Sequence, residues 1–95
     1  MDPQLEALRE RADQSLIAFL RAELDLGFTF ARTAKIETDI DQAGVERARK
    51  LAERALETVY QFQARIADHE KRREIQERAG ELEKLIFAMP EENSK

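Results

Sequence analysis

Apolar residues recur along this chain at steps of three and four, without the strict alternation of apolar and polar positions that marks a β-strand. Steps of three and four keep side chains on one face of an α-helix. The pattern therefore predicts an all-α protein, an antiparallel three-helix bundle whose helices cover residues of about 3–34, 40–67 and 71–88.

Polar caps mark where two of these helices are expected to begin. Asp2 followed by Pro3 is typical of an N-cap with proline at the first helical position. Asp39 with Gln42 three residues later resembles a capping box for the second helix. The caps predict that the first helix begins near residue 3 and the second near residue 40.

Pro90 is expected to end the third helix, because proline cannot continue the helical hydrogen bonds. We expect one helical domain over residues 1–90 and a disordered polar tail over residues 91–95. Between the second and third helices, nine residues separate Ile66 from Ile75. This spacing puts the two side chains on opposite faces of an unbroken helix. We therefore predict a bend near residues 68–71, with a continuous helix over residues 40–88 as the alternative.

The first helix has an apolar arc of about 200° on a helical wheel, which is wider than one partner helix can cover. Phe19 and Leu26 lie on one flank of this arc and Phe28 on the other. We expect both other helices to pack against it, with Gly27 in the middle of the arc allowing a close approach.

Glu23 lies inside that arc, where a buried carboxylate needs a partner. An antiparallel hairpin that turns at residues 35–40 would place Glu23 opposite Ala52, one turn from Arg49. The candidate buried ion pair is therefore Glu23 with Arg49. A functional carboxylate at Glu23, serving acid–base chemistry or a metal, is the alternative.

Composition removes several function classes. The 95 residues contain no cysteine and carry a formal net charge of −4, which argues against a disulfide framework and against nucleic-acid binding. The longest apolar run, residues 16–20, is far shorter than a membrane span. His69 falls far from Glu23 in the expected register, so no metal site or cofactor is predicted. We expect a cytoplasmic protein that is not an enzyme.

The segment DLGFTFARTAKIETDIDQAGVERARKLAERALETV carries Leu26-Gly27-x-x-Phe30 and, further on, small residues at Ala48, Ala52 and Ala55. Residues 24–59 thereby resemble a single tetratricopeptide-repeat helical hairpin. That resemblance implies peptide or protein binding on a helical face.

Surplus apolar surface on the first helix suggests a protein–protein interaction module, or a small adaptor or chaperone-like bundle. Its candidate interaction face is Ile17, Leu24, Phe28 and Phe87. The expected partners are a second copy, giving a dimer, or another protein. A structural or regulatory homo-oligomer, associating through the alanines of the second helix, is the alternative, and an enzyme or metal-binding protein centred on Glu23 ranks third.

Overall fold

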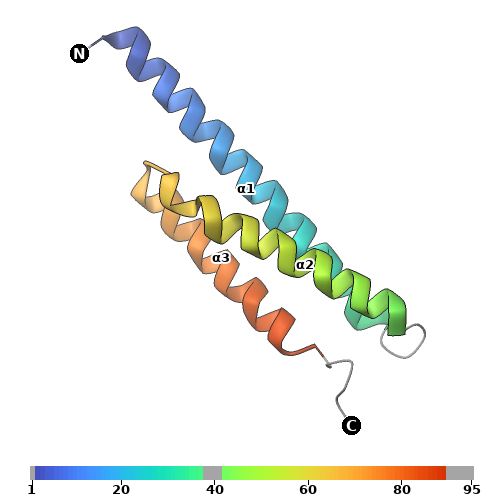
Figure 1. Cartoon of the computed structure of the whole chain (residues 1–95). Coiled ribbons are helices and arrows are strands. Elements are labelled where there is room, and N and C mark those ends of the chain that lie inside the picture. Colours follow the sequence, from blue (N-terminus) through green and yellow to red (C-terminus); the bar gives the residue numbers. More distant parts are fainter. Residues whose placement is uncertain (1, 38–41, 90–95) are drawn as a thin grey trace.

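The structure is a bundle of three helices that run alternately up and down (Figure 1). The computed structural model describes residues 2–37 and 42–89. Within them, α1 spans Pro3–Glu37, α2 spans Gln42–Phe62 and α3 spans His69–Phe87. Each helix packs against the other two. The predicted all-α, antiparallel three-helix bundle is therefore confirmed.

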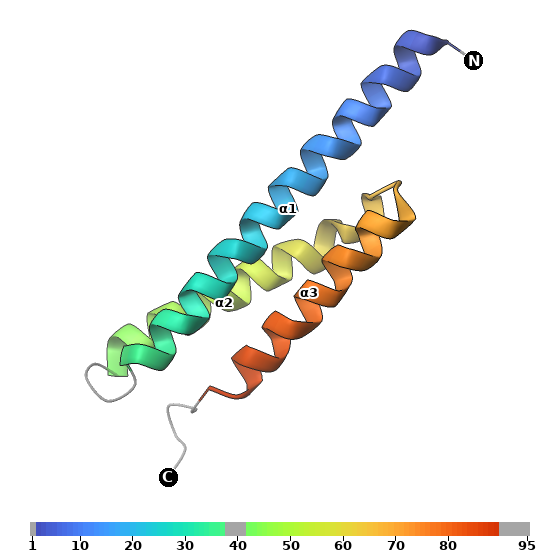
Figure 2. The same cartoon turned by 180° about the vertical axis from the view of Figure 1, so that it is seen from behind.

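The start of α1 follows the predicted cap. The Asp2 carboxylate accepts a hydrogen bond from the backbone N–H of Gln4 at 2.9 Å, and Pro3 is the first helical residue. Beyond this cap, residues 3–12 project past the corner between α2 and α3 in both views (Figures 1 and 2). Every side chain from 2 to 12 is exposed. We call residues 3–12 the N-terminal arm.

The chain bends between α2 and α3, close to the predicted position, and the alternative of one continuous helix is wrong. A short 3₁₀ turn, Gln63–Arg65, follows α2, and Ile66 has an extended backbone with φ −69° and ψ 122°. The second helix thus ends at Phe62 rather than at residue 67. The bend turns Ile66 and Ile75 into the same core, where both are buried.

Two carboxylates hold this corner. Asp68 accepts hydrogen bonds from the N–H groups of Glu70 and Lys71 at 3.0 and 3.1 Å, so α3 begins at residue 69 instead of the expected 71. Asp13 of α1 accepts from the N–H groups of Ala67 and Asp68 at 2.8 and 3.3 Å. The corner is therefore capped from within and also anchored to α1.

The register between α1 and α2 differs from the expected one. Gly27 lies against Ala55, whereas a turn at residues 35–40 would have placed it about two helical turns earlier on the second helix. The later helix ends account for about one turn of this shift, because α1 continues to Glu37 and α2 begins only at Gln42. The predicted cap at Asp39, and the predicted stop and tail at Pro90 and 91–95, lie outside the described residues.

Both neighbours approach α1 at Gly27, as the sequence predicted. A Cβ atom on this residue would lie 2.5 Å from Cδ2 of Leu82 and 3.3 Å from Cβ of Ala55. Gly80 on α3 differs, because a Cβ there would meet nothing within 4 Å. The first glycine therefore serves close packing, and the second does not.

The same substitution at the two glycines should have different effects on stability. Each Gly→Ala change gains about 1 kcal/mol of helix propensity, but at Gly27 the new methyl group also overpacks the core, which typically costs about 1–3 kcal/mol. We expect Gly80→Ala to raise the free energy of unfolding. We expect the free energy of unfolding of Gly27→Ala to be about 1–3 kcal/mol lower than that of Gly80→Ala. Urea denaturation followed by circular dichroism measures both, and equal shifts would contradict the close approach.

Candidate functional site

The residues predicted to form an interaction face do not form one. Ile17 and Leu24 are buried in the core, which removes both from the surface of the chain. Phe28 is half-buried against the core, and the Arg78 guanidinium lies 5.5 Å from the centre of its ring. Of the four, Phe87 alone is exposed, at 78%.

The alanines of α2 are not a free surface either. Ala48, Ala52 and Ala55 are all buried in the bundle, and Ala55 faces Gly27 of α1. Their small size serves the packing of α2 inside one chain. The sequence suggested self-association through these alanines of α2 as an alternative. Such self-association would require the bundle to open.

A different face of α1 carries the exposed apolar residues. The predicted arc is covered only in part, because Phe19 and Leu26 on its flank remain 47% and 49% exposed. They continue a line that begins in the N-terminal arm at Leu5 and Leu8, which are 43% and 61% exposed. We call this line the α1 stripe; it consists of Leu5, Leu8, Ala12, Ser15, Phe19, Ala22 and Leu26, all exposed.

Charged residues flank the stripe on both sides. Arg9 and Arg11 lie beside its N-terminal half, and Glu23 and Asp25 lie beside its C-terminal half. Asp25 also accepts a hydrogen bond from Arg78 of α3 at 2.8 Å, although its side chain is 70% exposed. The stripe therefore has a basic half and an acidic half.

The predicted ion pair between Glu23 and Arg49 does not form. Arg49 Nε donates to the Glu53 carboxylate at 3.2 Å, one turn along the same helix, and Glu23 is only partly buried. The register explains this difference, because the shift of about two turns moves Arg49 away from Glu23. No hydrogen bond or ion pair between described residues involves Glu23.

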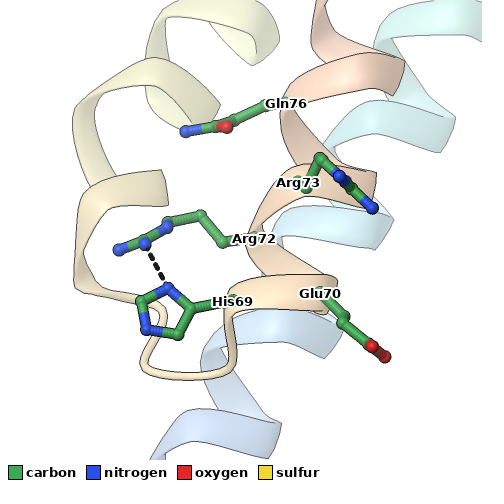
Figure 3. A pocket seen from close by; sticks show the side chains of 5 residues that line it. All are labelled: His69, Glu70, Arg72, Arg73 and Gln76. Carbon is green, nitrogen blue, oxygen red and sulfur yellow. Dashed lines mark hydrogen bonds between the residues drawn. The ribbon is translucent and has the colours of Figure 1, made fainter.

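His69 lies at the corner, at the start of α3. Its Nδ1 atom accepts a hydrogen bond from Arg72 Nη2 at 2.6 Å, and the two side chains point toward one another along the edge of an open hollow (Figure 3). Glu70 points away from this pair (Figure 3). Residues 2–37 and 42–89 contain no group of three side chains that could hold a metal ion.

One ionisable group has a displaced pKa. Burial raises the pKa of the Tyr60 phenol above its ordinary 10.0, and the neighbouring Glu83 carboxylate, which accepts its hydrogen bond, raises it further. Both effects keep the phenol protonated over the physiological range. The Tyr60 phenol is therefore not a candidate base.

No family model matches this sequence, and neither the curated proteins nor the solved structures give a significant match. The resemblance of residues 24–59 to a tetratricopeptide-repeat hairpin therefore stays a prediction. None of the helices in the described part of the chain combines the length and the apolar character that crossing a bilayer requires.

Proposed function

We propose that this chain is a non-enzymatic protein–protein interaction protein that self-associates through the α1 stripe. The observation that carries the proposal is the exposure of Leu5, Leu8, Phe19 and Leu26 along one line of a single helix. Contiguous exposed apolar surface of this kind marks interaction sites in soluble proteins. Single exposed residues elsewhere need no such explanation.

The N-terminal arm supports the proposal independently. Residues 3–12 project past the corner between α2 and α3 (Figure 1), and all their side chains are exposed. The end of a helix frays where no other element packs against it. A docked partner would stabilise the arm and would cover its two leucines, Leu5 and Leu8.

The proposal gives Glu23 no catalytic role. A general acid or base needs a second polar group within hydrogen-bond reach and a pocket that holds a substrate. No hydrogen bond or ion pair joins the Glu23 carboxylate to another described residue, and Glu23 lies at the edge of the α1 stripe. A charged residue beside an apolar stripe is typical of helix–helix interfaces.

Light scattering on two phenylalanine variants tests this proposal. We expect wild type to have about twice the 11.0 kDa mass of one chain, and Phe19→Glu to have the mass of a single chain, because a carboxylate in an apolar interface is strongly unfavourable. Phe87→Glu is the matched control, since Phe87 is more exposed but lies on α3, away from the stripe.

Two outcomes would contradict self-association through the stripe. The first is a wild-type protein with the mass of one chain at every concentration up to about 1 mM. The second is dissociation by Phe87→Glu and not by Phe19→Glu, which would move the interface to α3. Circular dichroism of each variant confirms that the bundle itself remains folded.

A further inference from the structure

We infer that the α1 stripe pairs with the α1 stripe of a second copy of this chain, and that the two α1 helices run antiparallel. This inference rests on the self-association proposed above. It adds to that proposal the direction of the two helices, their register and the charge pairs that select them.

The α1 stripe has the spacing of a coiled-coil seam. Its seven residues alternate steps of three and four from Leu5 to Leu26, which is the a and d pattern of a heptad repeat. Three full heptads are covered, and every position is exposed in the single chain. Thus α1 packs one face against α2 and α3 and leaves a second face, along its length, for another helix.

The charged residues that flank the α1 stripe favour an antiparallel direction of the two α1 helices. In the heptad that the stripe defines, Arg9 and Glu23 occupy e positions, and Arg11 and Asp25 occupy g positions. Antiparallel helices bring e against e and g against g. Arg9 of one copy can therefore pair with Glu23 of the second copy, and Arg11 with Asp25. The two-fold symmetry of the pair repeats both contacts, so four opposite-charge pairs form.

A parallel pair forms none of these contacts. Parallel helices bring each g position against the e position five residues later on the partner. Arg11 would then face Leu16, and Ala18 would face Glu23. The change from basic to acidic flanking residues along α1 thus gives opposite-charge pairs only in the antiparallel arrangement. Charge complementarity of this kind sets the direction of helix pairs more than their affinity.

The side chains of the stripe fit the same register. When the charge pairs form, leucines meet toward the ends of the seam and alanines meet inside them. At the centre, each Phe19 faces a Ser15, so a large side chain is matched with a small one. The facing residues are Leu8 with Leu26, Ala12 with Ala22, and Ser15 with Phe19. A shift by one heptad breaks up these matched layers and also loses the charge pairs.

Distances between spin labels test the direction directly. Because the chain has no cysteine, the exposed residues Ala7 and Ala18 can each be changed to cysteine and labelled in separate, otherwise full-length proteins. In the proposed register, the two copies of residue 7 lie about 20 residues apart along the seam, or about 30 Å. The two copies of residue 18 lie side by side, within about 20 Å.

The two labels together give a decisive result. We expect a distance of about 30 Å or slightly more for Ala7→Cys and a short one for Ala18→Cys. Short distances for both labels in a dimer would overturn the antiparallel arrangement and leave the proposed self-association intact. A wild-type protein that stays a single chain at every concentration would overturn the self-association, and this inference with it.

Charge reversal tests the register. Arg9→Glu and Glu23→Arg are each expected to raise the dimer dissociation constant about tenfold, because two symmetry-related pairs change from attraction to repulsion. The double variant restores opposite charges and should return to within about threefold of wild type. Glu10→Arg, which changes an exposed residue on the opposite side of the arm, is the control and should leave the constant within about threefold of wild type.

The double variant shows whether Arg9 and Glu23 pair directly. If its dissociation constant rises about a hundredfold, as two independent losses would give, Arg9 and Glu23 do not meet and the register is wrong. Sedimentation equilibrium at two salt concentrations measures wild type and the four variants. The difference between Arg9→Glu and wild type should shrink at high salt, since exposed charge pairs are screened.

Discussion

Replacing Leu82 by alanine is expected to lower the free energy of unfolding by about 2–5 kcal/mol, the range seen when a buried leucine leaves a cavity. Leu82 is fully buried, and its Cδ2 atom occupies the space that a Cβ at Gly27 would need. The leucine therefore fills the space between α1 and α3 beside Gly27. Urea denaturation at one fixed protein concentration measures the change without interference from self-association.

The matched control is Leu85→Ala on the same helix. Leu85 is 40% exposed, so the same change removes less buried surface and should cost under about 1 kcal/mol. Equal losses at the two positions would contradict the placement of α3. In a protein that already carries Leu82→Ala, the further change Gly27→Ala should raise the free energy of unfolding, because the Leu82 methyl groups that would clash with the new Cβ are gone.

The second large effect is expected at Asp13. Replacing it by alanine leaves the backbone N–H groups of Ala67 and Asp68 without their carboxylate acceptor. Hydrogen bonds to charged groups contribute about 1.5–3 kcal/mol each, but both N–H groups lie in exposed residues, where water can replace the acceptor. We expect a net loss of about 2 kcal/mol of unfolding free energy, measured by urea denaturation.

Asp2→Ala is the control for this variant. Asp2 also accepts a backbone hydrogen bond, from Gln4, but within the arm and far from the bundle. Its loss should cost under about 1 kcal/mol, because the end of a helix frays without unfolding the rest. If Asp13→Ala lowers the free energy of unfolding no more than Asp2→Ala does, the hydrogen bonds from the corner to Asp13 of α1 do not stabilise the bundle.

The helices and the bend were predictable because they follow from local spacing. The step of nine residues from Ile66 to Ile75 allows both side chains into one core only if the helix breaks, and the chain does break there. Gly27 was predictable for a similar reason, since only a small residue fits in the middle of an apolar arc that two helices cover. Periodicity carries this information without any knowledge of the partner helices.

Contacts between helices were less predictable. The expected Glu23–Arg49 pair was wrong because the helix ends, on which the register depends, are the least certain feature of a sequence prediction. The bond from Asp13 to the corner joins residues more than fifty positions apart, and nothing local marks it. Such contacts appear only when the helices are placed in space.

Two residues of the α1 stripe, Phe19 and Leu26, were expected to lie in the core. Phe19 and Leu26 lie on one flank of a 200° arc, and a helix wheel cannot tell which part of a wide arc the other helices cover. The signal that would have separated them is the unbroken alternation of three and four from Leu5 to Leu26. It runs on into the arm, which the expected register placed beside the end of the second helix.

Hydrogen exchange in the N-terminal arm, measured over a series of protein concentrations, tests the central claim most directly. If a second copy covers the α1 stripe, the amides of residues 5–12 should become more protected as the concentration rises, and Phe19→Glu should abolish the change. Core amides around Leu20 should not respond. Arm amides that exchange at the same rate at every concentration would contradict the account.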